Sequence, residues 1–124
     1  MAALILLAHG SPDPEWIRPI ERTADHLRAL APAYHVATAT LDGDSFVSTV
    51  ATSIAAGHHD IRVLAYFMSP GGRHLKRDIP ELVEAARAGH PEATITLIPG
   101  ALGVADEVLD ALARAALRLG GGPL

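Results

Sequence analysis

Four short apolar runs alternate with four stretches of helical periodicity, and this alternation limits the fold more than any other feature of the chain. The runs cover residues 3–8, 35–41, 61–68 and 93–98. Apolar residues recur at steps of three and four in the stretches that follow them, which are 15–31, 45–57, 78–89 and 104–119. Such alternation predicts an α/β fold, a four-stranded parallel sheet with right-handed crossovers and helices on both faces.

We expect the strand order 2-1-3-4, which makes the first and third strands neighbours at the point where the order reverses. A chain of 124 residues is one domain by size. We assign residues 1–119 to this domain and 120–124, which begin with three glycines, to a flexible C-terminal tail.

Composition excludes several classes of function. The chain has no cysteine, so any metal must be held by His, Asp or Glu. Acidic residues outnumber basic ones by 14 to 10, which argues against a nucleic-acid partner. The apolar start of the chain is too short to span a membrane and lacks a basic leader, so we expect a soluble, cytoplasmic protein without membrane association.

The positions of the seven histidines divide them into two groups. Ligands of open parallel sheets bind beyond the carboxyl ends of the strands. Only His9 and His74 follow strands, the first and the third, so we predict that their imidazoles face one cleft. The others precede strands or lie in the first helix; they are His26, His35, His58, His59 and His90. The adjacent pair His58 and His59 therefore falls at the wrong edge for a site.

The stretch from Tyr66 to Glu81 joins the third apolar run to the third helix through a glycine turn. Asp78 and Glu81 have capping-box spacing, and Pro80 suits a first turn, so we expect the helix to begin at Asp78. Three cations near this predicted helix start, Arg73, Lys76 and Arg77, either solvate the loop or form an anion-binding rim.

Familiar catalytic motifs are missing from the sequence. There is no Gly-x-Ser-x-Gly elbow, no phosphate-binding Gly-Lys-Ser/Thr loop and no Gly-x-Gly-x-x-Gly after the first strand. A histidine phosphatase would need an arginine before His9, where the chain has Ala8. Neutral imidazole is a good ligand for divalent transition metals, so His9 and His74 indicate metal chemistry. The alternative is a flavodoxin-like interaction domain in which both histidines are structural.

Two segments carry a resemblance to a known family. They are LLAHGSPDP at residues 6–14 and YFMSPGGRHLKRDIP at residues 66–80. In order, spacing and strand context the chain resembles the class II chelatases, specifically the short sirohydrochlorin cobaltochelatase-like family, over nearly its whole length. The resemblance implies a flavodoxin-type half-domain of the two-lobed chelatase architecture, with a homodimer supplying the missing lobe.

The resemblance also implies an activity and a site. The activity is insertion of a divalent metal, Co2+, Fe2+ or Ni2+, into a sirohydrochlorin-type tetrapyrrole in cobalamin or siroheme biosynthesis, with the metal as substrate and no organic cofactor. His9 and His74 would be the catalytic and metal-binding pair. Asp42 stands where the family often has a glutamate with longer reach. The residues expected to bind the tetrapyrrole are Gly10, Ser11, Asp42, Phe67, Met68, Gly71, Gly72, Arg73, Leu75 and Lys76. The alternative is a non-catalytic metal or tetrapyrrole carrier with the same cleft.

Overall fold

A computed structural model of the chain describes residues 2–122, except for the side chain of His74. The elements follow the predicted alternation, in the order β1 (Ala2–Ala8), α1 (Pro14–Leu30), β2 (His35–Thr40), α2 (Ser45–Ala55), β3 (Asp60–Ala65), the π-helical turn η1 (His74–Asp78), α3 (Ile79–Gly89), β4 (Thr94–Leu97), the 3-10 turn η2 (Leu102–Val104) and α4 (Asp106–Leu119). The last two residues of the predicted tail, 123 and 124, lie outside the described residues.

The sheet has the predicted order β2-β1-β3-β4, and every pair of neighbours is parallel. At its carboxyl edge Ala8 of β1 is in register with Thr40 of β2, and Leu7 is in register with Ala65 of β3. The residues that follow β1, β2 and β3 therefore emerge side by side, as the order 2-1-3-4 requires.

β3 is shorter than the apolar run that predicted it. It ends at Ala65, and residues 66–68 leave the sheet. Tyr66 still donates from its N–H to the carbonyl of Leu7 at 2.8 Å, but the carbonyl of Phe67 accepts from Gly103 in η2 instead of from a strand. The apolar residues 66–68 thus form a loop beyond the sheet edge.

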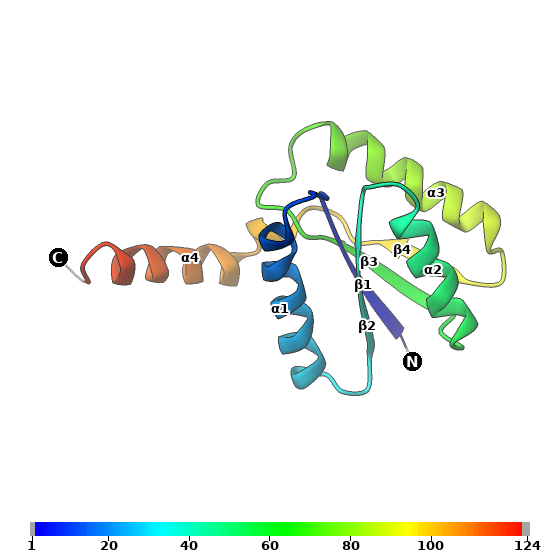
Figure 1. Cartoon of the computed structure of the whole chain (residues 1–124), viewed down its shortest axis with the longest axis horizontal. Helices are drawn as coiled ribbons and strands as arrows, with labels where there is room; N and C mark the ends of the chain where they lie inside the picture. Colours follow the sequence, from blue (N-terminus) through cyan, green and yellow to red (C-terminus); the bar gives the residue numbers. More distant parts are fainter. Residues whose placement is uncertain (1, 123–124) are drawn as a thin grey trace.

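The two faces of the sheet carry separate cores because successive strand side chains point to opposite sides. One core packs the odd-numbered residues of β1 and β3 against α2 and α3, and Phe46 of α2 is its largest fully buried side chain. The other packs Leu6 and Ala8 against Ile20 and Ala24 of α1. Helices cover both faces, as predicted (Figure 1).

The predicted capping box at Asp78 and Glu81 is wrong. Asp78 has helical backbone angles, φ −67° and ψ −44°, and its side chain makes no capping hydrogen bond. The helix begins a turn earlier, with the π-helical residues His74–Asp78. Pro80 lies in the first turn of α3, as predicted, where a missing N–H costs little.

Helix α4 forms where the sequence predicts it but packs differently from the other helices. None of its 14 residues is buried. Figure 1 shows it extending away from the sheet instead of lying against it. Within residues 2–122 no helix has both the length and the apolar character needed to cross a membrane.

Candidate active site

His9 lies at the carboxyl end of β1, where its imidazole is exposed above the buried Gly10. Its Nδ1 is 2.9 Å from the carbonyl oxygen of Gly10. A carbonyl only accepts, so this contact favours the tautomer with the proton on Nδ1 and the lone pair on Nε2. The neutral ring then presents the nitrogen that can bind a metal ion or accept a proton.

Asp42 is brought to His9 by the β1–β2 pairing. Leu41 donates from its N–H to the carbonyl of Ala8 at 3.0 Å, which fixes the turn after β2 against the end of β1. A Cβ built on Gly10 would lie 1.7 Å from Oδ2 of Asp42. The carboxylate therefore packs directly over the Gly10 backbone, and a side chain at position 10 would displace it.

An acidic hollow of about 420 Å³ opens on one side of His9. Its lining residues are His9, Leu41, Asp42, Asp78, Glu81, Leu82 and Ala85. The carboxylates of Asp78 and Glu81 come from the start of α3, and Glu81 also accepts from Arg77 at 3.4 Å. The spacing of Asp78 and Glu81 predicted a helix N-terminal capping box. The same i, i+3 spacing also places both side chains on one face of a helix.

A second hollow of about 380 Å³ on the other side of His9 is mostly apolar, with Glu15 as its one acidic residue. It is lined by Ala8, His9, Glu15, Trp16, Pro19, Ile20, Tyr66, Phe67 and Met68. Trp16 is 58% exposed and donates from Nε1 to the carbonyl of His9 at 2.8 Å. Phe67 and Met68 are among the binding residues expected from the sequence, whereas Trp16 and Tyr66 are not. The only tryptophan of the chain, in the first turn of the helix after His9, was the available signal.

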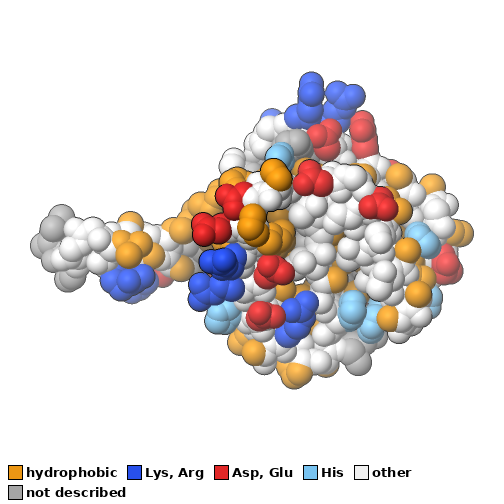
Figure 2. All heavy atoms as spheres, viewed as in Figure 1, with side chains coloured by type: hydrophobic (Ala, Val, Ile, Leu, Met, Phe, Trp, Pro, Cys, Tyr) orange, Lys and Arg blue, Asp and Glu red, His pale blue; other side chains and the backbone are white. Residues whose placement is uncertain are grey.

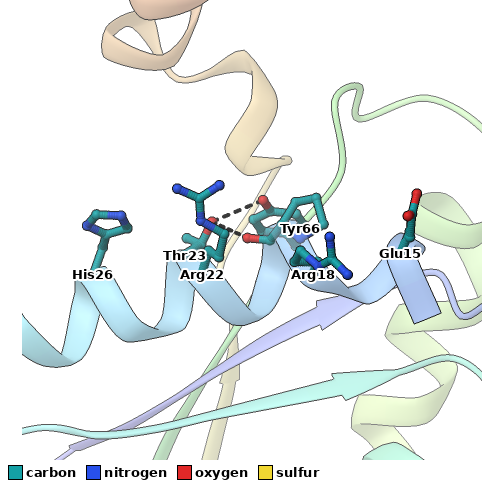
Figure 3. Close-up of a pocket in the computed structure, with 7 residues that line it drawn as sticks. Glu15, Arg18, Arg22, Thr23, His26 and Tyr66 are labelled. Atoms are coloured by element: carbon teal, nitrogen blue, oxygen red, sulfur yellow. Dashed lines mark hydrogen bonds between the residues drawn. The ribbon is translucent and has the colours of Figure 1, made fainter.

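Two arginines and a histidine line a hollow along α1 that adjoins the apolar hollow. Arg18, Arg22 and His26 lie along one side of the helix, with Tyr66 among them (Figure 3). The hydroxyl of Tyr66 is 3.0 Å from Oγ1 of Thr23, which ties the loop after β3 to α1. The surrounding hollow of about 390 Å³ shares Glu15, Pro19 and Tyr66 with the apolar hollow. The sequence did not predict this group of basic residues, because Arg18 and Arg22 have the pattern of ordinary solvent-exposed helix residues.

The other predicted binding residues lie around this edge. Ser11 accepts from the N–H of Asp13 at 3.1 Å in the entry to α1. A further group of predicted residues lines neither of the two hollows at His9; it comprises Gly71, Gly72, Arg73, Leu75 and Lys76. Leu75 packs against the core under α2 and α3, whereas Arg73 and Lys76 are exposed. Their contact with a substrate stays a prediction.

His74 is placed by its backbone at the start of the π-helical turn, after the loop that follows β3. Its side chain lies outside the described part of the structure. Among the described side chains no group of three or more His, Asp and Glu could hold a metal ion. Metal binding by His9 and His74 therefore stays a prediction.

His35 and His58 stack at the sheet edge opposite His9, with ring centroids 4.4 Å apart and planes 17° from parallel. Burial lowers the pKa of His35, and the nearby positive charges of His58 and Arg28 lower it further. The pair joins the start of β2 to the turn before β3, which matches a structural role.

Known structures with this architecture identify the class of protein. A CbiX protein of Marinobacter aquaeolei VT8, provisionally assigned to cobalamin (vitamin B12) biosynthesis, superposes with a TM-score of 0.80 at 27% identity over 97% of both chains. SirB of Bacillus subtilis, solved with Fe3+, superposes with a TM-score of 0.81 at 18% identity over 98% of this chain. This chain covers 48% of SirB, about half of its length. The fold is that of the class II chelatases.

The family itself follows from the sequence. The family model described as CbiX matches residues 3–119, so the chain belongs to the CbiX family of chelatases. None of the curated proteins compared with this chain matches it significantly.

Proposed function

We propose that this protein inserts a divalent metal ion, Co2+, Fe2+ or Ni2+, into a sirohydrochlorin-type tetrapyrrole and serves cobalamin or siroheme biosynthesis. The observation that carries the proposal is the position of His9 in a chain of the CbiX family. Its exposed imidazole stands where a mostly apolar and an acidic hollow meet. A chelatase needs these two environments, one for the ring and one for the ion.

The tetrapyrrole fits the apolar side. A flat ring gains most from aromatic and aliphatic contacts, which Trp16, Phe67 and Met68 supply. The carboxylates at the rim of such a ring need cations, and Arg18 and Arg22 line the adjoining hollow, which shares Glu15, Pro19 and Tyr66 with the apolar one. In this pose the edge of the ring lies against the His9 imidazole.

The metal ion approaches from the acidic side. Asp42, Asp78 and Glu81 attract a hydrated cation and exchange for part of its water shell. Nε2 of His9 and the imidazole of His74 then hold the ion beside the ring. Imidazole binds these ions without the tight grip of a thiolate, so the ion can be released into the ring.

Insertion also requires two proton transfers. Each metal–nitrogen bond to a pyrrole that carried an N–H releases one proton, so one divalent ion displaces two protons from the ring. His9 accepts a proton on Nε2, and Asp42 beside it passes protons to water. The net change is one ion in and two protons out.

We propose that two copies of the domain, residues 1–119, form the working unit. SirB is about twice as long as this chain, which supports a missing half. In a single copy the His9 residue is exposed at the edge of the sheet. A second copy supplies the opposite wall of the cleft.

The activity is tested by mixing purified protein with sirohydrochlorin and Co2+, Fe2+ or Ni2+ in turn and following the visible spectrum. We expect at least one metal to be inserted about 10²-fold faster than in a protein-free mixture, a typical effect of one positioned acid–base group. If the protein does not accelerate insertion of any of the three metals, the proposal is refuted. Tight binding of ring or metal without insertion would establish the carrier alternative.

A further inference from the structure

Helix α1 begins beside His9, and its first turn carries an exposed tryptophan. Trp16 is 58% exposed, although an aromatic side chain of this size gains most from burial. Its Nε1 donates to the carbonyl of His9 at 2.8 Å, so the nitrogen edge of the indole is held and the open area belongs to the rest of the ring system. The chain thus keeps a flat apolar surface in a fixed position next to His9.

The loop after β3 continues this apolar surface. Phe67 is half-buried and Met68 is 65% exposed, and both line the hollow of about 380 Å³ that contains Trp16. Exposed apolar surface that gathers in a hollow is typical of ligand-binding sites. Methionine adapts its shape to a ligand, whereas the tethered indole does not. The hollow therefore suits a flat molecule with an apolar centre, and Trp16 sets the plane in which that molecule lies.

Two arginines on the same helix have no ion-pair partner among the described side chains; they are Arg18 and Arg22. They lie one turn apart and line the adjoining hollow of about 390 Å³ beside Tyr66 (Figure 3). Arg28, farther along α1, is already paired with Asp25 at 2.9 Å. Figure 2 shows hydrophobic side chains gathered where α4 joins the body, with Lys and Arg side chains beside them. Arg18 and Arg22 are therefore available for the carboxylates of a ligand, which a guanidinium binds with paired hydrogen bonds.

The two hollows adjoin along α1, because Glu15, Pro19 and Tyr66 line both. Trp16 and Arg22 are six residues apart, which is about 9 Å along the helix axis. This distance is comparable with the reach from the centre of a tetrapyrrole to the carboxylates on its rim. A ring stacked on Trp16 therefore brings one edge to Arg22. Glu15 repels carboxylates at the start of the helix, which leaves the arginine side as the place for them.

The three cations expected either to solvate a loop or to form an anion-binding rim lie elsewhere. Arg73 and Lys76 line neither of the two hollows at His9, and Arg77 pairs with Glu81 at 3.4 Å. All three also stand outside the hollow along α1. The cations in the hollow that adjoins the apolar one are therefore those of α1.

We propose that α1 selects the substrate by its carboxylates. The ring stacks on Trp16, and Arg18 and Arg22 bind the carboxylates along the edge of the ring that lies against the helix. This inference rests on the proposed function and extends it, because it assigns ring selectivity to two arginines outside the predicted site. The cleft should then favour a tetrapyrrole with carboxylates on its rim over a flat ring of the same size without them.

Binding of metal-free rings tests this selectivity without an insertion step. Trp16 is the only tryptophan of the chain, so quenching of its fluorescence reports a ring bound at this place. The probes are uroporphyrin, which carries carboxylates on its rim, and a water-soluble porphyrin that carries N-methylpyridinium arms instead. Arg18→Gln and Arg22→Gln should each weaken the binding of uroporphyrin about tenfold and should not weaken the binding of the cationic probe.

Arg118→Gln is the matched control, because it removes one exposed cation from the end of α4 and changes the net charge equally. It should alter the affinity for neither probe. Equal losses for both probes in the α1 variants, or an unchanged affinity of both variants for uroporphyrin, would overturn the inference.

Insertion kinetics separate this inference from the proposed function. Arg22→Gln should raise KM for sirohydrochlorin about tenfold and change kcat by less than about twofold, because Arg22 binds the rim of the ring, away from the reacting nitrogens. Trp16→Leu should lower kcat as well, since the ring loses the surface that fixes its plane. Normal KM values in both arginine variants would overturn the inference and leave the proposed function standing. Arginine-dependent binding of uroporphyrin without any metal insertion would support the inference and refute the proposed function.

Discussion

At the residue scale, the contact between Gly10 and Asp42 sets the geometry around His9. The Asp42 carboxylate occupies the space that a Cβ at Gly10 would need. The adjacent imidazole of His9 is held by the contact of its Nδ1 with the Gly10 carbonyl. The turns after β1 and β2 therefore place a base and a carboxylate together at the edge of the sheet.

Gly10→Ala should displace the carboxylate and disturb His9. We expect insertion to slow by about 10²-fold, the cost of an ångström-scale misplacement at a reacting centre. In an Asp42→Ala background the same substitution should cost much less, because the clash is gone and the two changes are not additive. Insertion kinetics of the four proteins measure this coupling. Equal effects of Gly10→Ala in both backgrounds would refute the contact.

The stacked pair at the opposite edge makes a prediction about pH. Burial, with the charges of His58 and Arg28, lowers the pKa of His35 below the ordinary value of 6.5. As pH falls through 6.5, the unfolded chain takes up a proton at His35 and the folded chain does not, so the free energy of unfolding decreases. His35→Gln should flatten this decrease in urea titrations across that range. An unchanged pH slope in His35→Gln would show that the residue titrates normally.

At the scale of elements, η2 supports the loop that carries the site. The N–H of Gly103 bonds to Phe67, and its missing side chain lets η2 lie on the backbone of Met68. The π-turn that follows this loop carries the backbone of His74. Turns of this kind are frequent at functional sites, where they re-aim a side chain.

Gly103→Ala should therefore damage both stability and insertion. The new Cβ would meet backbone atoms, which cannot rotate away, so we expect a loss of about 1–3 kcal/mol in the free energy of unfolding. Gly89→Ala is the matched control, since nothing lies within 4 Å of a Cβ there and it ends a helix. That change should be neutral or stabilising by about 0.5–1 kcal/mol. Similar losses in both variants, from chemical denaturation, would contradict the close contact.

At the scale of the whole molecule, periodicity was enough for the topology but not for every contact. The parallel sheet with helices on both faces and the place of His9 after the first strand follow from the alternation of apolar runs. The order 2-1-3-4 was one of the orders open to such a sheet, and it is the one observed. The π-turn was missed because Asp78 and Glu81 also fit a cap. Trp16 was missed because its place beside His9 depends on how α1 crosses the sheet. For α4 the periodicity predicted the helix, but it carried no information on whether the helix packs against the sheet, and none of its residues is buried.

Insertion rates of single variants test whether His9 and His74 carry metal insertion. His9→Ala and His74→Ala are assayed with sirohydrochlorin and the metal that the unmodified protein inserts best, beside the double variant His58→Ala with His59→Ala. Circular dichroism verifies that all variants are folded. We expect His9→Ala and His74→Ala each to lower the insertion rate by about 10²-fold or more. The double variant should keep the rate of the unmodified protein. Full activity in His9→Ala or in His74→Ala would contradict this assignment.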